Sequence, residues 1–358
     1  MKSIRASLLS LACCALAATV LPAWAAPAPN VVVQPAVIGP QAMHAVLQGI
    51  ARAGTRLVAV GERGVVLLSD DNGEHWRQAP TPVSVTLTAV QFVDERNGWA
   101  VGHAGVVLHS RDGGEHWALQ LDGVRAAELE QDAAEQAGEP TRLAAAERLV
   151  ADGADKPLLA LHFSDARHGL AVGAYGLAFS TDDGGAHWQS LMGRIPNSGG
   201  LHWYAVARQG QHLYLAGEQG ALVRSEDGGQ TFEALQSPYE GSYFAAAVMP
   251  SGRLLVGGLR GKLFASDDQG ASFQPLPTAV PASFNAITLV GQRVLLLNQA
   301  GQLMQSGLGA FTPRPLPFDT SMPLTAIAEA ADGSLVGVGF NGPQRLAATP
   351  ARSFNQAE

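Results

Sequence analysis

Cysteine is almost absent from this chain of 358 residues. The only two cysteines, Cys13 and Cys14, lie within the first 25 residues, which have the pattern of a secretory signal peptide. That pattern is a basic start with Lys2 and Arg5, an apolar run, and an Ala-Trp-Ala cleavage tripeptide at 23–25. We therefore expect residues 1–25 to be removed during secretion across the inner membrane. The mature, periplasmic protein would then have no disulfide and no thiolate metal site.

Lysine and long apolar runs are scarce as well. Outside the leader only Lys156 and Lys262 remain, and the mature chain has 21 basic residues against 31 acidic ones, a formal net charge of −10. Such an acidic surface disfavours nucleic acid and anionic lipid as partners. No stretch of the mature chain is apolar over the length of a spanning helix, so we expect no direct membrane insertion. The tripeptide Leu-Ala-Cys at 11–13 lies inside the apolar run and not at its end, which disfavours a lipid anchor.

What the chain has in abundance is one short repeat, with the pattern S/T-x-D-x-G-x-x-W/F. Its aspartate can accept backbone hydrogen bonds in a tight turn, its glycine supplies a residue with positive φ, and its aromatic ring opens the return strand. These features predict a structural hairpin turn, the Asp-box. The five intact copies contain Asp71 and Trp76, Asp112 and Trp117, Asp183 and Trp188, Asp227 and Phe232, and Asp268 and Phe273. A degenerate sixth copy ends at Phe311.

A second glycine-flanked signature precedes each aromatic residue by about a dozen positions, as in Val-Gly-His-Ala-Gly at 101–105, and occurs seven times. Most repeats span about 40 residues, which is the length of a four-stranded propeller blade. We name the strands of each blade A to D, so that the second signature is the B–C turn and the Asp-box is the C–D turn. The sequence therefore predicts an all-β, seven-bladed β-propeller over residues 26–350, followed by a tail at 351–358.

The last blade lacks a clear D strand, whereas residues 31–37 form a spare apolar segment without a hairpin partner. Pairing this segment with the blade that contains 335–338 would close the ring and remove exposed sheet edges. We expect this closure.

One insertion interrupts the repeats after the second blade. Residues 123–156 are rich in Ala, Glu, Gln and Arg, with a glycine after 124–137 and a proline at the start of 140–152. This pattern predicts a helical hairpin. Since the links between blades share a face with the B–C turns, we expect the insertion to overhang that face.

The repeats give little indication of a catalytic or metal-binding site. The Asp-box carboxylates resemble a catalytic set, but the turn uses them, and no metal-ligand spacing is present, so we expect no catalytic residue, no metal and no cofactor. Sialidases also contain Asp-boxes, preceded by an Arg-Ile-Pro motif. Here Arg194-Ile195-Pro196 follows the third box, and no other carboxylate pair can be placed for glycoside hydrolysis. A sialidase-like glycoside hydrolase is the alternative to a binding protein.

The B–C turns are the stronger candidate for function, because their tips differ while the flanking glycines repeat. Aromatic and arginine side chains on the rim of a ring suit a protein contact surface. Aromatic residues also enter strand A from this face. The candidate partner-binding residues are Glu62, Arg63, His103, Tyr175, Trp203, Tyr204, Glu218, Arg260, Phe340 and Asn341. The acidic first helix of the insertion, with Glu128, Glu130, Asp132 and Glu135, would add mixed charge to the same face.

The chain resembles the photosystem II stability/assembly factor family of Asp-box propellers. The resemblance rests on the stretch from Asn97 to Trp117, its echo from His168 to Gly176, and seven such blades after a signal peptide. It implies a non-catalytic lumenal or periplasmic chaperone that binds newly made membrane protein. The insertion and the small number of basic residues depart from the photosynthetic members, whose propeller has an arginine-rich face. The partner expected for this non-photosynthetic relative is a periplasmic loop of an inner-membrane protein or transporter.

Overall fold

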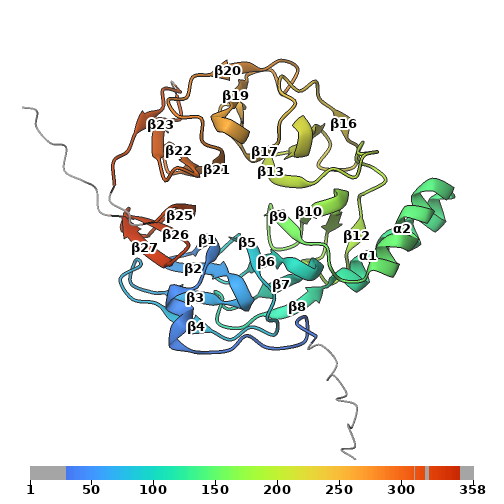
Figure 1. The fold of residues 1–358 in the computed structure, drawn as a ribbon, viewed down its shortest axis with the longest axis horizontal. Coiled ribbons are helices and arrows are strands. Elements are labelled where there is room, and N and C mark those ends of the chain that lie inside the picture. Colours follow the sequence, from blue (N-terminus) through green and yellow to red (C-terminus); the bar gives the residue numbers. More distant parts are fainter. Residues whose placement is uncertain (1–29, 310, 319–321, 347–358) are drawn as a thin grey trace, which may run out of the picture. The chain divides into compact units, whose positions relative to one another are not determined.

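Seven sheets stand around a central axis, and strand A of each blade lines that axis (Figure 1). The computed structural model describes residues 30–309, 311–318 and 322–346. The expected signal peptide and C-terminal tail lie outside these residues. The repeats thus predict the architecture correctly: a seven-bladed β-propeller with two helices inserted after blade 2.

The strands follow the repeat with little variation. The A strands are β1 (Leu47–Ala53), β5 (Leu87–Phe92), β9 (Leu158–Phe163), β13 (Trp203–Gln209), β17 (Tyr243–Val248), β21 (Phe284–Val290) and β25 (Leu324–Glu329). The B strands are β2 (Arg56–Gly61), β6 (Gly98–Gly102), β10 (Gly169–Gly173), β14 (His212–Gly217), β18 (Leu254–Gly258), β22 (Arg293–Asn298) and β26 (Leu335–Gly339). The C strands are β3 (Val66–Ser69), β7 (Val107–Ser110), β11 (Ala178–Thr181), β15 (Leu222–Ser225), β19 (Leu263–Ser266), β23 (Leu303–Gly307) and β27 (Gly342–Leu346). The D strands are β4 (Arg77–Ala79), β8 (Ala118–Leu121), β12 (Gln189–Ser190), β16 (Glu233–Ala234), β20 (Gln274–Leu276) and β24 (Arg314–Pro315).

The core lies between the blades, and the B and C strands supply most of it. Strand β6 is buried along its whole length, because each of its faces packs against a neighbouring sheet. Aromatic rings join blades 2 and 3: Trp99 on β6 stacks on Phe163 of β9, with the ring centroids 3.7 Å apart, and on its other side it stacks on His109. A sheet buried on both faces requires apolar runs in its middle strands, which is the pattern that the repeats show.

Ring closure differs from the expectation. The segment 31–37 does not pair with the last blade. It crosses the end of blade 1 instead, where the Ser84 amide donates to the Val31 carbonyl and the Ala36 amide to the Thr81 carbonyl. Val32 is buried there in the cluster that joins blades 1 and 2. Burying Val32 against this apolar seam is about as favourable in free energy as burying it against the last sheet would be. In addition, Pro35 has no backbone N–H to donate to a neighbouring strand.

Blades 7 and 1 meet through side-chain packing and a few polar contacts. A cluster that contains Leu47 and Val336 spans the seam, and the Thr325 hydroxyl donates to the Leu47 carbonyl at 2.7 Å. At the outer edge, Arg345 of β27 pairs with Glu74 of blade 1 at 2.6 Å. The short helix η1 (Pro40–His44) also packs against β27, and the Gly342 amide donates to Ala45 nearby. In the part of the chain that the structure describes, the last blade keeps three strands.

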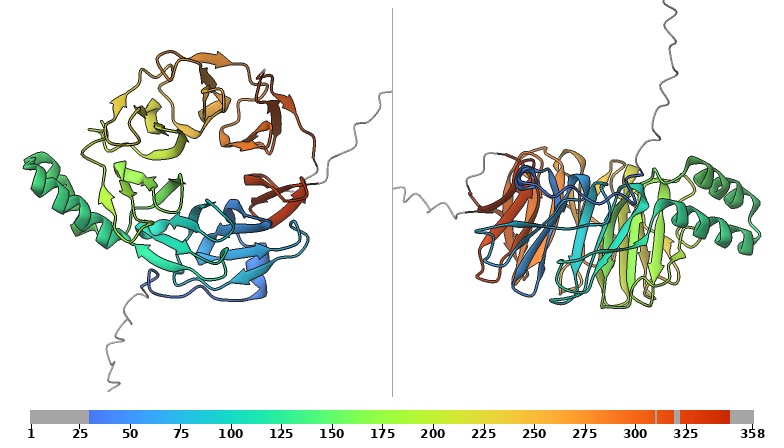
Figure 2. Two further views of the ribbon diagram at one scale, coloured as in Figure 1. Left: turned by 180° about the vertical axis from the view of Figure 1, so that it is seen from behind. Right: turned by 90° about the horizontal axis from the view of Figure 1, so that it is seen from below.

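The insertion consists of α1 (Gly123–Ala137) and α2 (Pro140–Asp152), as expected. Asp122 caps α1 by accepting from the Arg125 amide, and Gly138 ends it with a positive φ of 65°. Both helices point away from the ring at its outer rim (Figure 1; Figure 2, right). The expectation that the insertion overhangs the B–C-turn face is therefore wrong. The physical cause is Glu130 of α1, which is buried against Ser190 of β12 on the outside of blade 3.

The Asp-box turns lie at the end of the blades opposite to the B–C turns, and the first copy shows their geometry. The Asp71 carboxylate accepts from the Ser69 hydroxyl at 2.8 Å and from the His75 amide at 2.9 Å. Its second oxygen lies 2.7 Å from His75 Nδ1. The Gly73 carbonyl accepts from the Trp76 indole, and the Gly73 amide donates to Ser69. The hydrogen bonds of the His75 backbone, then of its ring, hold the pKa of Asp71 well below its usual range.

The other four boxes repeat this arrangement, and both carboxylate oxygens are used in each. Thr231 and Ser272 take the place of the histidine in the fourth and fifth copies, where their hydroxyls donate to the carboxylate at 2.5 and 2.6 Å. The aspartates concerned are Asp112, Asp183, Asp227 and Asp268. Both oxygens of each carboxylate therefore hold the turn together, which is a structural role.

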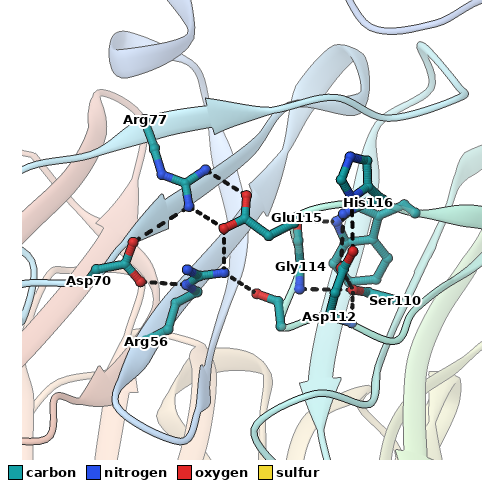
Figure 3. A network of polar contacts seen from close by, with 10 residues as sticks. Arg56, Asp70, Arg77, Ser110, Asp112, Gly114, Glu115 and His116 are labelled. Carbon is teal, nitrogen blue, oxygen red and sulfur yellow. Dashed lines mark hydrogen bonds and ion pairs between the residues drawn. The ribbon is translucent and has the colours of Figure 1, made fainter.

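A network of ion pairs joins blades 1 and 2 on the Asp-box side (Figure 3). Arg77 of β4 binds the Glu115 carboxylate with both terminal nitrogens, and Arg56 of β2 lies 2.8 Å from the same carboxylate. Arg56 also donates to Asp70 at 2.5 Å and to the Gly113 carbonyl at 3.2 Å. These contacts fix one Asp-box against the neighbouring blade, which is a structural role.

Candidate protein-binding face

In blades 1 to 5 the B–C turns are three-residue turns with an unusual backbone. They are η2 (Glu62–Gly64), η3 (His103–Gly105), η4 (Ala174–Gly176), η5 (Glu218–Gly220) and η6 (Leu259–Gly261). The central residue of each has a left-handed backbone with φ between 51° and 56°, although none is glycine. These central residues are Arg63, Ala104, Tyr175, Gln219 and Arg260. A side chain in this region costs about 1–2 kcal/mol. We call the end of the ring that carries these turns the B–C face.

Most of the sequence-predicted contact residues reach solvent on the B–C face. Tyr175 and Phe340 are 55% and 53% exposed, which is high for aromatic residues. The other exposed members of the set are Arg63, His103, Arg260 and Asn341. Tyr204 is half-buried. Trp203 is completely buried between blades, so its inclusion among the contact residues is wrong. Its ring packs into the core because it lies one residue before a break in the strand alternation.

Two of the candidates, Glu62 and Glu218, hold the turn against the start of strand A. Glu62 accepts from the Val46 amide at 2.9 Å, and Glu218 accepts from the His202 amide at 3.2 Å. The His202 ring nitrogen Nδ1 also lies 2.7 Å from Glu218. Both carboxylates therefore shape the B–C face, and both remain partly exposed.

A ring of β-bulges surrounds the axis just inside the turns. In each blade the register of strand A shifts at its second residue, so that this side chain turns toward the axis. The seven bulge residues are Gln48, Thr88, Leu159, Tyr204, Phe244, Asn285 and Thr325. Apart from Tyr204, sequence reasoning did not select this set as a site. The available signal was their common position: in six of the blades the bulge residue directly follows the strand-A residue that pairs with the first glycine of the B–C turn.

The bulge residues divide into two halves. In blades 2, 6 and 7 the side chains of Thr88, Asn285 and Thr325 donate to a carbonyl of the next blade at 2.7–2.8 Å. In blades 3, 4 and 5 the residues are apolar or aromatic. A cavity of about 630 Å³ opens between the halves and is lined by five of the bulge residues together with Phe284, Gln299, Pro323 and Phe340. Among the bulge residues alone, the mouth of the channel is polar on blades 1, 2, 6 and 7 and apolar or aromatic on blades 3 to 5.

The charges of the face are more dispersed than expected. Arg63 and Arg260 stand on blades 1 and 5, whereas the insertion lies at the rim beside blades 2 and 3 (Figure 1). Glu130 is buried in an ion pair, so it contributes no charge to the surface, whereas Glu128, Asp132 and Glu135 are exposed. Among the described residues no group of His, Cys, Asp and Glu could hold a metal ion. None of the helices within those residues is long and apolar enough to cross a membrane.

The Arg-Ile-Pro tripeptide lies in the link between blades 3 and 4. Ile195 is buried in the core between these blades, and the Arg194 amide donates to the Leu191 carbonyl in a turn. The motif therefore has a packing role at this position.

Fold and turn geometry together define an Asp-box β-propeller. The family described as "Photosynthesis system II assembly factor YCF48" matches residues 68–134 and 142–240, from the third strand of blade 1 through blade 4. This match confirms the resemblance seen in the sequence. One relative, the photosystem II assembly lipoprotein Ycf48 of Synechococcus sp. (strain CC9902), is 36% identical over 77 residues. That match covers 22% of this chain and only 23% of the relative.

Several solved structures share the fold. Ycf48 bound to D1 peptide aligns with a TM-score of 0.61 at 17% identity and covers 88% of this chain and 96% of that one. Ycf48 from Cyanidioschyzon merolae aligns with a TM-score of 0.60 at 16% identity, covering 85% and 96%. The WD40 β-propeller domain of Doa1 aligns with a TM-score of 0.62 at 10% identity, covering 86% and 95%. At these identities the likeness establishes the fold alone.

Proposed function

We propose that this chain is a non-catalytic, periplasmic binding propeller that assists the assembly of a membrane protein complex. It would hold a periplasmic loop of an inner-membrane protein or transporter. The observation that carries the proposal is the B–C face, where one left-handed turn recurs in five blades and presents an exposed arginine, tyrosine or glutamine side chain in four of them. The family match supports an assembly role, and the solved Ycf48 structure with a D1 peptide shows that a propeller of this family binds polypeptide.

The contact residues proposed are the exposed ones. Tyr175 and Phe340 offer apolar anchors on blades 3 and 7, and Arg63 and Arg260 offer charge on blades 1 and 5. Large rings and guanidinium groups supply most of the binding energy in protein interfaces. His103, Tyr204 and Asn341 complete the surface, while Glu62 and Glu218 hold its backbone.

The proposal can be tested by crosslinking and capture from membranes of the source cells. The bait proteins are the wild type, a deletion of 123–156, and the double variant Arg63→Glu/Arg260→Glu. The matched control is Asp182→Arg, a charge reversal at an exposed side chain beside the third Asp-box. We expect the double variant to lose the membrane partner and the control to retain it. Equal recovery with all four proteins would contradict a partner site on the B–C face.

The non-catalytic part of the proposal has its own test. Purified mature protein is assayed with a panel of aryl glycosides and sialosides, and we expect no turnover. Hydrolysis that survives repurification, and that disappears with the substitution of one carboxylate outside the Asp-boxes, would favour the glycosidase alternative.

A further inference from the structure

Four aromatic rings form a continuous row along the aromatic half of the channel mouth. Tyr175, at the tip of η4, lies 4.9 Å from His202 between ring centroids. His202 lies 6.0 Å from Tyr204, and Tyr204 lies 5.2 Å from Phe244. The row crosses blades 3, 4 and 5 and ends at the central cavity, which Phe244 lines. We call these four residues the aromatic row.

The backbone of these blades keeps the aromatic row exposed to solvent. Tyr204 and Phe244 are the bulge residues of their strands, and the neighbours Trp203 and Tyr243 are fully buried. The bulges therefore turn one aromatic side chain of each pair out of the core. Tyr175 is held outward by its left-handed backbone. Rings that pack only to fill space are normally covered, whereas all four of these remain accessible to solvent.

The electrostatics of the row favour a cation. The face of an aromatic ring carries partial negative charge, which attracts ammonium and guanidinium groups. Glu218 adds a carboxylate, 30% exposed, next to His202. Burial, and after it the charge of Glu218, raises the pKa of the Tyr204 hydroxyl.

The chain itself places one cation on the row. Lys156 lies with its ammonium group 5.3 Å from the ring centroid of Tyr175. That ammonium group is already paired with Asp152 and Asp155 at the base of the insertion. Within the described residues, it is the one cation that lies over an aromatic ring. The inner rings, Tyr204 and Phe244, carry none.

We propose that the aromatic row binds an arginine or lysine side chain of an extended polypeptide segment at the mouth of the central channel. The cation would lie over Tyr204 and Phe244 with Glu218 as its counter-charge. The cavity beside Phe244 is lined on other blades by the side-chain amides of Gln48 and Gln299, which can bond peptide groups of the same segment. This inference rests on the proposed function, since it names the chemistry of the partner segment. The aromatic row would therefore select a basic segment of the partner, which agrees with the acidic net charge of the chain.

The test uses the mature protein and a set of short fluorescent peptides. They share one Gly/Ser background and differ at a single central residue, which is arginine, its neutral isostere citrulline, or glutamate. We expect the arginine peptide to bind about tenfold more tightly than the citrulline peptide, as a cation over two rings beside a carboxylate requires. The preference should weaken in high salt. Equal binding of the arginine and citrulline peptides, or no binding of the arginine peptide, would overturn the inference.

Variants locate the site. Tyr204→Leu/Phe244→Leu and Glu218→Gln should each abolish the preference for arginine, and Glu218→Gln retains an acceptor for the His202 amide. The matched control is Tyr239→Leu, a half-buried ring that donates to the Leu259 carbonyl of η6 and is outside the row, and it should keep the preference. A circular dichroism melt of each variant confirms folding. If an oligosaccharide competes for the row and arginine peptides do not, the row is a sugar platform and the inference is wrong.

The capture experiment separates this inference from the proposed function. If wild-type protein captures a membrane partner and Tyr204→Leu/Phe244→Leu captures it equally well, the aromatic row is not the contact and the proposed function stands. If the wild type captures no partner while the arginine preference persists, the row binds cations but the assembly role is wrong.

Discussion

Arg142 of α2 donates two hydrogen bonds to the carboxylate of Glu130 on α1, at 2.8 and 2.9 Å, and the Ser190 hydroxyl of blade 3 donates a third. Glu130 is only 3% exposed. A buried carboxylate requires such complete pairing, because its desolvation is expensive. This triple contact directs the insertion outward along the rim instead of across the B–C face.

The first prediction concerns this contact. Glu130→Ala removes the buried partner of the half-buried Arg142 guanidinium and leaves it only the exposed Glu139 at 4.0 Å, and breaking such a buried pair typically costs about 3–5 kcal/mol. Because the insertion is peripheral, we expect that cost to appear as local opening. Hydrogen exchange of 123–156 should accelerate strongly while the melting temperature of the propeller changes little. The control Glu135→Ala removes an exposed carboxylate of the same helix and should leave exchange unchanged. Unchanged protection in Glu130→Ala would show that other contacts dock the insertion.

The second prediction concerns the Asp-box, and two adjacent aspartates provide its control. Asp183 bonds the amide and ring of His187, whereas Asp182 is exposed. Asp183→Ala should lower the free energy of unfolding measurably, because it leaves turn donors unpaired. Asp182→Ala should change it by less than about 0.5 kcal/mol. Chemical denaturation measures both. If Asp183→Ala unfolds like the wild type yet loses partner binding or a measurable activity, the carboxylate has a function beyond the turn.

The third prediction is a pH dependence of stability. His109 is buried against Trp99, and burial, with a smaller effect of Arg111, lowers its pKa to about 4. Burial likewise lowers the pKa of His162 to about 4. Because the folded state disfavours the proton, the stability is complete above the unfolded pKa of about 6.5 and falls as the pH drops from there toward 4. For His109 alone the loss approaches about 3 kcal/mol.

Melting curves between pH 7 and 5 measure the onset of this loss, because the aspartates with lowered pKa add their own pH dependence only as the pH approaches their unfolded pKa of about 4. His109→Phe keeps a ring on Trp99 and removes the titrating group, so its stability should depend less on pH. His103→Phe, on the exposed tip of η3, should retain the slope of the wild type. An identical slope in all three proteins would exclude His109 as the cause.

The fourth prediction concerns the seam between blades 7 and 1. Thr325→Val keeps the shape of the side chain and removes the hydroxyl that donates to the Leu47 and Val338 carbonyls. We expect the free energy of unfolding to fall by about 1–2 kcal/mol. Thr288→Val, on the A strand of blade 6, is the matched control and should be nearly neutral. Equal effects of the two substitutions would mean that the seam contact is unimportant for ring stability.

Sequence periodicity predicted the blades well, because each repeat carries its own turn chemistry. Asp112, Gly114 and Trp117 specify one C–D turn within eight residues, and that turn fixes the register of its hairpin. Local signals of this kind need no knowledge of the rest of the chain. For the same reason the helices of the insertion were predicted with nearly correct ends at Gly138 and Gly153.

The sequence-based predictions were wrong where one side chain could pack against either of two distant surfaces. Val32 is apolar, but nothing in its neighbourhood indicates whether it covers blade 1 or blade 7. Trp203 and Tyr204 are adjacent aromatics, and a β-bulge determines which of them turns outward. Glu130 resembles the exposed carboxylates of its helix until Ser190, 60 residues away, packs against it. In each case the packing of the side chain depends on tertiary contacts that no local sequence pattern encodes.

The left-handed tips of the B–C turns also bear on how such a protein changes over evolutionary time. At Arg63, Tyr175, Gln219 and Arg260 the backbone conformation is equally unfavourable for most side chains. Exchanging one of these residues for another therefore leaves the energy of the scaffold nearly unaltered while it changes what the rim can recognise. A lineage that inherits this ring can drift from one client protein to another through single substitutions, without passing through poorly folded intermediates.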